Sequence, residues 1–384
     1  MLVAGEASGD ALGAGLARAL KARLGDGVRF VGVGGAAMAR EGVESPFDLA
    51  EISVIGAVEG LMAYPRIIRR VNDTARLAAR EKPDIAVLID SWGFTLRVAQ
   101  RLRRQNPDLP LIKYVGPQVW AWRPGRAKTL ARTVDHLLTI HTFDAPYFEA
   151  EGLSTTFVGA AALALDLARA DPDRLRAAID AAPDQPILLV LPGSRPAEIE
   201  RLSPVFEDAV YRLTTERPEL RVVVPAAATV ADEVKAKVAA WRSPAQVIEG
   251  DMLKYDAMRA ATVALACSGT VTSELAMGGC PMVVAYRTGE LGYRVMRLLL
   301  RLRFLTLFNI AANEAIAPEF IQHDCTGPKL AKAIAERLDD PALRARQIAA
   351  QTAILEKMGR DGPNPADLAA DEVVRVLKAR GLVA

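Results

Sequence analysis

The stretch ILLVLPGSRPAEIERLSPVFEDAVYRLTTE, residues 187–216, decides the fold class of this sequence. Its first five residues are apolar and predict a strand that is buried on both faces, whereas residues 204–216 have a helical pattern. A loop that contains glycine, serine and arginine connects the two. Strand, loop and helix in this order form the repeating unit of a parallel sheet, in which each helix crosses over to the next strand.

The same unit recurs on both sides of this stretch, with further helical patterns at residues 11–24 and 97–104. Such alternation requires parallel sheets that helices cover on both faces. We therefore expect an α/β protein with two Rossmann-like parallel-sheet domains. The predicted strands are 2–4, 28–33, 85–90, 111–115, 136–140, 155–158, 187–191, 221–225, 246–249, 263–266 and 282–286.

A break in the alternation at residues 159–184, which are rich in Ala, Asp and Pro, indicates a domain boundary. We expect a first domain over 1–165 and a second over 166–358. The sequence GRDGPNP then interrupts the helical pattern, and a last helix follows within 359–384. Because no strand comes after this helix, it can pack back on the first domain.

Composition excludes several classes of protein. A net charge of +2 argues against a nucleic-acid partner that is held by bulk electrostatics. Three cysteines and three histidines without ligand spacing give no support for a metal site, and no cofactor is indicated. Neither a signal peptide nor an apolar run of about 18 residues is present. We expect a cytoplasmic protein, soluble or peripheral to a membrane.

Ligands bind beyond the carboxyl ends of strands in open parallel sheets, and the loop GEASGD follows the first strand. Gly5 and Gly9 permit a tight turn, and Ser8 or Asp10 can cap the next helix. A turn with a cap alone is the alternative for these four residues. Glu6 has no place in either role, so we interpret the loop as a contact to an acceptor sugar and place Ser8 and Gly9 among the substrate contacts.

The loop LPGSR follows the strand at 187–191 and is typical of an anion site. Gly193 and Ser194 offer backbone N–H groups at the start of a helix. Arg195 adds a planar guanidinium group that fits phosphate oxygens. The alternative is an exposed loop arginine without a ligand.

The loop CSGTVTSE, after the strand at 263–266, has similar features. Ser268, Gly269 and Thr270 stand at a helix N-terminus, where free N–H groups and the helix dipole favour a diphosphate. Glu274 lies one turn further along the same face, where its carboxylate can accept both hydroxyls of a ribose. Simple helix capping is the alternative.

The segment YVGPQVWAWR, residues 114–123, places two tryptophans behind a Gly-Pro turn. Core packing explains one of Trp120 and Trp122 more easily than both. We place Gln118 and Trp120 among the substrate contacts and leave core packing open as the alternative for the tryptophans.

Two segments are both basic and strongly apolar. Arg294, Arg297, Arg301 and Arg303 alternate with leucines and other apolar residues, and the apolar residues 54–62 precede Arg66, Arg69 and Arg70. Amphipathic helices of this composition lie in membrane interfaces. A helix buried between domains or in a homodimer is the alternative.

At these motifs the sequence resembles the lipid-A-disaccharide synthase family over essentially its whole length. The resemblance rests on VAGEASGD (3–10), SVIGAVEGL (53–61), GPQVWAWR (116–123), LPGSR (191–195) with Glu198, SGTVTSELA (268–276), PMVVAYR (281–287), Asn309-Ile310, and Pro318-Glu319 with Gln322. It implies a GT-B fold whose second domain holds a UDP-sugar donor, and it adds Asn309 to the substrate contacts. The reaction that it implies joins UDP-2,3-diacylglucosamine to 2,3-diacylglucosamine 1-phosphate, giving a β-1,6-linked disaccharide 1-phosphate and UDP. It also implies inverting, metal-independent transfer at the inner membrane of a Gram-negative cell.

Three departures from the family pattern lie in the first half of the chain. Gly93 occupies the second acidic position of the D-x-P-D-F segment, Ala160 replaces the histidine of G-H-P, and HTFD (141–144) stands in place of L-P-F-E. The general base that inverting transfer requires stays open among Asp90, Glu6, Asp10 and His141. Two other functions stay open as well: a donor-binding paralogue without catalysis, and a UDP-sugar epimerase on the same fold.

Overall fold

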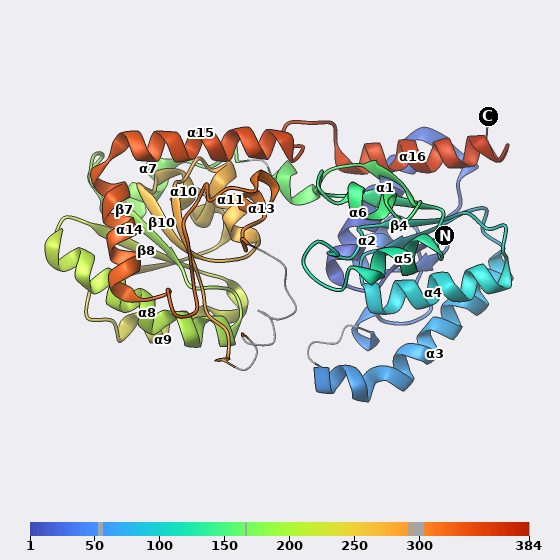
Figure 1. Cartoon of the computed structure of the whole chain (residues 1–384), viewed down its shortest axis with the longest axis horizontal. Coiled ribbons are helices and arrows are strands. Elements are labelled where there is room, and N and C mark those ends of the chain that lie inside the picture. Colours follow the sequence, from blue (N-terminus) through green and yellow to red (C-terminus); the bar gives the residue numbers. More distant parts are fainter. Residues whose placement is uncertain (53–56, 166, 291–292, 294–302, 384) are drawn as a thin grey trace. The chain divides into compact units, whose positions relative to one another are not determined.

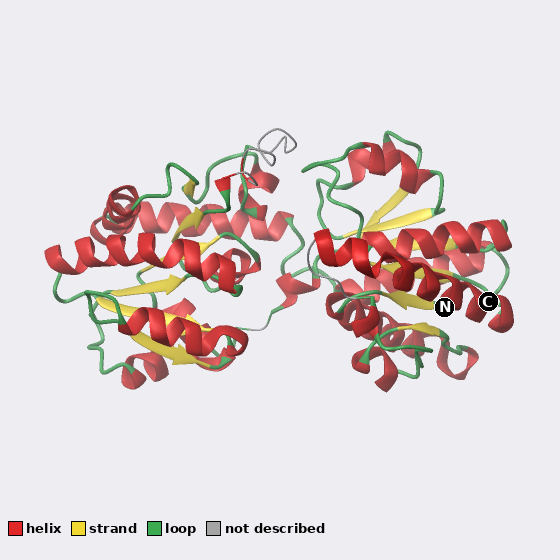
Figure 2. Ribbon diagram, turned by 90° about the horizontal axis from the view of Figure 1, so that it is seen from below, coloured by secondary structure: helices red, strands yellow, loops and turns green. Residues whose placement is uncertain are grey.

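The computed structural model describes residues 1–52, 57–165, 167–290, 293 and 303–383 (Figure 1). The chain forms two compact units, one made of Met1–Ala161 with Gly362–Ala384 and the other of Ala162–Asp361. Each unit contains a six-stranded parallel sheet packed against helices (Figure 2). This confirms the predicted α/β class with two Rossmann-like sheets.

The sheet of the first unit has the strand order β2-β1-β3-β4-β5-β6. Its strands are β1 Leu2–Ala4, β2 Gly32–Val33, β3 Ala86–Ile89, β4 Leu111–Tyr114, β5 His136–Thr139 and β6 Ser154–Phe157. Its helices are α1 Ala7–Leu24, α2 Ala36–Arg40, α3 Ala57–Glu81, α4 Trp92–Gln105, α5 Gly125–Ala131, α6 Ala145–Glu149 and α16 Pro365–Ala379.

Alternate residues of these strands enter two separate apolar clusters, one on each face of the sheet. Val3 and Leu88 belong to one cluster, and Leu2 and Val87 belong to the other. Because both faces are covered, β3 and β4 are buried at every position. This is why β3 is a continuous apolar run and β4 is apolar except at Lys113.

Strand β2 is shorter than the predicted 28–33, because it lies at the edge of the sheet and pairs only with β1. The amide of Leu2 still donates to the carbonyl of Val31, but the residues before it are half-buried or exposed. A Cβ on Gly32 would lie 1.8 Å from the carbonyl oxygen of Leu2, so this close approach requires glycine.

The last helix, α16, packs on α1 in the first unit. Arg23 of α1 forms ion pairs with Asp367 and Asp371 of α16. Val373 and Leu377 are buried in the same apolar cluster as the first strand. A helix from the end of the chain thus completes one cover of the first sheet.

The sheet of the second unit has the strand order β12-β11-β10-β7-β8-β9. Its strands are β7 Ile187–Leu191, β8 Arg221–Ala226, β9 Gln246–Glu249, β10 Val263–Cys267, β11 Met282–Tyr286 and β12 Glu319–Ile321. Its helices are α7 Pro172–Ala178, α8 Pro196–Glu216, α9 Ala231–Ala239, α10 Asp251–Ala260, α11 Thr270–Met277, α13 Leu307–Ala312, α14 Gly327–Asp339 and α15 Pro341–Lys357.

Strand β12 was not predicted, because three half-buried residues that begin with a glutamate carry no strand pattern. The Glu319 carboxylate accepts hydrogen bonds from the amides of Leu305 and Thr306, which secures the preceding segment to the strand. Tertiary contacts therefore decide this edge of the sheet.

Strand order also places the ligand-binding edges. In the first sheet the order reverses between β1 and β3, and in the second it reverses between β7 and β10. In open parallel sheets, ligands bind at the carboxyl ends of strands where the order reverses. The loops after β1, β7 and β10 are among the four that the sequence singled out, whereas the fourth, within residues 114–123, follows β4. Asp90, a candidate base, directly follows β3.

Candidate active site

A pocket of about 570 Å³ lies at the reversal point of the second sheet. It is lined by the loops after β7 and β10, together with the ends of β8 and β9. The sequence-predicted residues that it brings together are Gly193, Ser194, Arg195, Ser268, Gly269, Thr270 and Glu274.

The loop after β7 presents a cation at the start of α8. Gly193 has a φ of 121°, and a Cβ there would lie 2.8 Å from the Glu198 carboxylate, so only glycine fits. Glu198 accepts from the amide of Ser194 at 3.4 Å and pairs with the Arg195 guanidinium at 3.0 Å. The Arg195 side chain is 79% exposed and can reach an anion.

The loop after β10 leads into α11 through Gly269, whose position has no side-chain cap. The first backbone N–H groups of α11 are therefore available to an anionic ligand in the pocket. Glu274 pairs with Lys254 of α10, with 3.1 Å between the ammonium nitrogen and the carboxylate. Burial is the largest single influence and lowers the pKa of Lys254, but the Glu274 carboxylate, together with Tyr255 and Asp251, raises the pKa overall.

Lys254 is a pocket residue that sequence reasoning missed. The available signal was its position shortly after the predicted strand 246–249, where loops to the ligand-binding edge begin. The sequence does not otherwise distinguish this lysine from a surface lysine, since most lysines in helices are solvated.

At the reversal point of the first sheet, the loops after β1 and β3 touch. The Ser8 hydroxyl donates to the Asp90 carboxylate at 2.9 Å, and a Cβ on Gly5 would lie 2.5 Å from the hydroxyl oxygen of Ser91. Asp90 and Ser91 have φ values of 49° and 39°, which non-glycine residues rarely adopt. Such backbone strain is concentrated at functional sites, where surrounding contacts hold it in place.

Lys113 of β4, which sequence reasoning also missed, lies beneath this loop and is only 2% exposed. Its ammonium donates to the Asp90 carbonyl and to the Thr95 hydroxyl. Burial lowers the pKa of Lys113 to about 7, although the carboxylates of Asp90 and Glu6 act in the opposite direction. Lys113 thus secures the strained turn from below.

Glu6 and Asp10 have different surroundings, although both follow β1. Glu6 is exposed at the N-terminal boundary of α1. Asp10 is buried, and its carboxylate accepts from three backbone N–H groups of the turn into α2 (Gly35 at 2.7 Å, Ala37 at 2.9 Å, Met38 at 3.0 Å). The prediction that Asp10 is a base is therefore not supported, because these bonds already occupy its oxygens.

Trp120 is buried in the first unit, and its indole N–H donates to the Asp144 carboxylate at 2.8 Å. Core packing therefore accounts for Trp120, and the predicted substrate contact is not supported. Gln118 and Trp122, from the same loop, lie further outward: Gln118 is exposed and Trp122 is half-buried. Burial raises the pKa of Asp144 to about 7, against the opposing effect of the indole hydrogen bond.

His141 stacks on Phe143, with ring centroids 5.1 Å apart, and is 7% exposed. Burial lowers the pKa of His141 to about 4. A base of this strength accepts protons poorly near neutral pH, so His141 is a weaker choice than a carboxylate at the edge of the sheet.

Asn309, which the resemblance placed among the substrate contacts, is fully buried. Its amide group exchanges hydrogen bonds with the backbone of Ala317 and donates to Glu319 at 2.9 Å. These bonds satisfy the side chain internally. Asn309 therefore holds the segment before β12 and is unavailable to a ligand.

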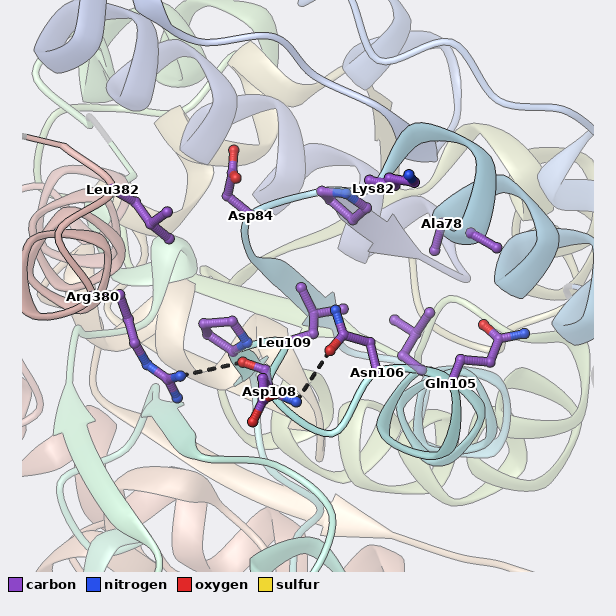
Figure 3. A pocket seen from close by; sticks show the side chains of 13 residues that line it. Ala78, Lys82, Asp84, Gln105, Asn106, Asp108, Leu109, Arg380 and Leu382 are labelled. Atoms are coloured by element: carbon purple, nitrogen blue, oxygen red, sulfur yellow. Dashed lines mark hydrogen bonds between the residues drawn. The ribbon is translucent and has the colours of Figure 1, made fainter.

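Another pocket, of about 680 Å³, lies at the opposite edge of the first sheet, beside the amino ends of β3 and β4 (Figure 3). In it the Arg380 guanidinium donates to the Asp108 carbonyl at 3.3 Å. No predicted site residue lines this pocket. Its position away from the carboxyl ends of the strands separates it from the candidate site.

Within the described part of the chain, no group of three or more His, Cys, Asp or Glu residues is placed to hold a metal ion. None of the described helices is both long and apolar enough to cross a membrane. The basic segment 294–303 lies outside the described residues, apart from Arg303, and so do residues 53–56 of the other apolar segment.

Comparison with known proteins identifies the family. A family model described as lipid-A-disaccharide synthetase matches residues 1–373. The lipid-A-disaccharide synthase of Paramagnetospirillum magneticum is 45% identical over 379 residues, which cover 98% of this chain and 97% of that protein. The lipid-A-disaccharide synthase of Rhodospirillum centenum is 41% identical over 379 residues, which cover 99% of this chain and 94% of that protein.

Solved structures with the same fold bind UDP or UDP-sugars. The S. aureus MnaA–UDP co-structure matches with a TM-score of 0.61 at 14% identity, covering 100% of this chain and 97% of that one. UDP-GlcNAc 2-epimerase from Neisseria meningitidis bound to UDP-GlcNAc matches with a TM-score of 0.58 at 12% identity, covering 98% and 99%. Identities this low establish the fold alone, whereas the sequence matches extend over nearly the whole chain. The chain therefore belongs to the lipid-A-disaccharide synthase family.

Proposed function

We propose that this protein is an inverting glycosyltransferase that joins UDP-2,3-diacylglucosamine to 2,3-diacylglucosamine 1-phosphate. The 6-hydroxyl of the acceptor attacks the anomeric carbon of the donor, the bond from that carbon to UDP breaks, and a base accepts the hydroxyl proton. The observation that carries the proposal is the donor-type pocket of the second unit, in a chain of this family.

The second unit supplies the groups that a departing diphosphate requires. Arg195 and the N-termini of α8 and α11 place positive charge in one pocket. Such groups stabilise the negative charge that develops on the leaving group. In this proposal Glu274, which pairs with Lys254 at 3.1 Å, accepts hydrogen bonds from the hydroxyls of the ribose.

The first unit supplies the acceptor side. Asp90 is the base that its surroundings favour. The Ser8 hydroxyl donates to its carboxylate, and the Lys113 ammonium donates to its backbone carbonyl, so both its side chain and its backbone are held at the edge of the sheet. Glu6 follows the neighbouring strand and is the second choice. Gly93 and Ala160 cannot carry protons, so a donor-binding paralogue is the outcome that the experiment must separate from a transferase.

The deciding experiment measures UDP release from the acylated donor, with and without the acylated acceptor. We expect release that depends on the acceptor and continues in EDTA, because Arg195 and two helix N-termini neutralise the diphosphate. UDP binding without any transfer would establish the paralogue. Formation of an epimeric UDP-sugar in the absence of acceptor would establish an epimerase. Loss of transfer in EDTA that magnesium restores would contradict metal independence.

We further propose that the protein associates with the inner membrane peripherally and by charge, since both substrates carry acyl chains. Arg66 and Arg69 of α3 are exposed beside Tyr64, which is 48% exposed. Each arginine near an anionic surface contributes on the order of 1 kcal/mol. We expect phosphatidylglycerol vesicles to sediment the wild type at low salt, and a variant with Arg294, Arg297, Arg301 and Arg303 changed to Ser to bind less. Equal sedimentation of the two proteins would contradict the membrane role of that segment, and phosphatidylcholine vesicles serve as the uncharged control.

A further inference from the structure

Two arginines and two tryptophans of the first unit form an arginine–tryptophan cluster, made of Trp92, Trp122, Arg123 and Arg126. The Arg126 guanidinium lies between the tryptophans, 5.1 Å from the ring centre of Trp92 and 5.0 Å from that of Trp122. The guanidinium carbon of Arg123 lies over the Trp122 ring, 4.3 Å from its centre. The contacts are close enough for cation–π attraction, which holds both guanidinium groups in place.

The cluster lies on the ligand-binding edge of the first sheet. Trp92 is the first residue of α4, two residues after Asp90 at the end of β3. Trp122 and Arg123 belong to the loop after β4, and Arg126 to the short helix α5 that follows. The loop is held in an unusual conformation, since Arg123 has a φ of 52°. The cluster therefore lies at the ends of β3 and β4, and β3 is the strand that Asp90 follows.

The positive charge of the cluster is not neutralised within the described part of the chain. Neither guanidinium forms an ion pair there, in contrast to Arg70, which pairs with both Glu51 and Asp73. Arg126 is half-buried, and burial together with the charge of Arg123 lowers its pKa. Two adjacent cations without a carboxylate favour an anion with at least two charges.

The position of the guanidinium groups over the indole rings indicates the kind of anion. Both guanidinium groups lie over indole rings, and neither donates a side-chain hydrogen bond within the described part of the chain. Their N–H groups are therefore free to match two oxygens of one phosphate. The indole faces exclude water from one side of each guanidinium, which strengthens such hydrogen bonds. A phosphate monoester, which approaches two negative charges at neutral pH, meets both requirements.

We propose that the arginine–tryptophan cluster binds the phosphate monoester of the acceptor sugar and thereby selects phosphorylated acceptors. This inference rests on the proposed function for the identity of the acceptor. The diphosphate of the donor has its own pocket in the second unit, whereas the acceptor carries its phosphate on the sugar that approaches the base. The cluster supplies binding and orientation, and Asp90 supplies the proton transfer.

The test compares transfer to 2,3-diacylglucosamine 1-phosphate with transfer to the same sugar without phosphate. In the wild type we expect a strong preference in kcat/KM for the phosphorylated sugar. Arg126→Gln and Arg123→Gln should each reduce this preference about ten- to a hundredfold, the effect of losing a hydrogen bond to a charged group. Lys128→Gln removes one charge from the exposed side of the same helix and should leave the preference unchanged. An unchanged preference in both arginine variants, or an equal loss in Lys128→Gln, would overturn the proposal.

A second measurement separates this inference from the proposed function. Binding of glucosamine 1-phosphate and of glucosamine is followed by tryptophan fluorescence, with UDP affinity as the check that each variant is folded. Phosphate-dependent binding that Arg126→Gln abolishes supports the cluster even if no transfer occurs. Transfer with no such binding, or arginine variants that lose only their affinity for phosphatidylglycerol vesicles, would assign the cluster another role and overturn the proposal.

Discussion

Replacing Asp90 with Asn is expected to lower kcat by about 10²–10⁴, the range for loss of a general base, while the affinity for UDP stays unchanged. Asp90 accepts a hydrogen bond from Ser8 at 2.9 Å, and its own carbonyl accepts from the buried Lys113. These contacts hold one carboxylate at the reversal point of the first sheet. Asn keeps the size and the Ser8 hydrogen bond, so the variant removes the proton acceptor alone.

Glu6→Gln tests the second choice under the same assay, and Asp108→Asn is the matched control. Asp108 is an exposed carboxylate at the opposite edge of the same unit, so the Asp108→Asn variant should keep the wild-type kcat. If Asp90→Asn and Glu6→Gln both retain wild-type turnover, the base lies elsewhere. If the unmodified protein binds UDP but never transfers the sugar, the donor-binding paralogue replaces the transferase as the proposed function.

Position 93 allows a rescue of the Asp90→Asn variant. It is the second residue of α4 and is exposed, and a Cβ there would meet nothing closer than Arg97 at 4.0 Å. A carboxylate fits this position and is favoured by the N-terminal end of the helix dipole. Gly93→Asp in the Asp90→Asn background should therefore raise kcat at least about tenfold above that of Asp90→Asn alone. Absence of recovery would mean that position 93 is too far from the acceptor hydroxyl to act.

Replacing Arg195 with Ala is expected to weaken UDP binding by about 1.5–3 kcal/mol, or roughly ten- to 150-fold in Kd. The Arg195 guanidinium is 79% exposed in the pocket and is oriented by Glu198 at 3.0 Å. Its loss removes a charged hydrogen bond to the diphosphate and leaves the Glu198 carboxylate to repel the ligand. Calorimetric titration with UDP measures the change.

The controls for Arg195 separate charge from geometry. Arg195→Lys keeps the charge and loses the planar guanidinium group, so its affinity for UDP should lie between those of the wild type and Arg195→Ala. Arg212→Ala removes an arginine of the same helix that pairs with Asp208 outside the pocket, and UDP affinity should not change. Glu274→Ala should weaken the binding of UDP more than that of its 2′-deoxy analogue, which keeps only one of the two ribose hydroxyls. Unchanged UDP affinity in both Arg195→Ala and Glu274→Ala would contradict the placement of the donor.

The sequence by itself determined the fold class and the loops that form the donor pocket. Alternating apolar runs and helical patterns are local properties, because a parallel strand covered on both faces must be apolar throughout. The loop residues Gly193 and Gly269 are equally local signals. A tight turn and an uncapped helix start depend only on a few neighbouring residues, so LPGSR and CSGT could be interpreted without knowledge of the strand order.

Only the tertiary structure decided which polar side chains are available to a ligand. Trp120 and Trp122 are indistinguishable as residue types, yet Asp144 holds one inside the core and the other stays half-buried under two arginines. Asp10 and Asn309 carry groups that suit a site, but backbone groups 25 and 8 residues further along the chain already occupy them. Burial and hydrogen bonding of this kind depend on which segments the fold brings together.

The same reason explains why Lys113, Lys254 and the arginine–tryptophan cluster were missed. Lys113 looks like a single interruption of an apolar strand, and its role arises only because Asp90 ends the neighbouring strand. Ser8 and Asp90 are 82 residues apart, and no local pattern links them. Periodicity and loop chemistry are encoded over a few residues, whereas a site is assembled by strand order, which local sequence does not specify.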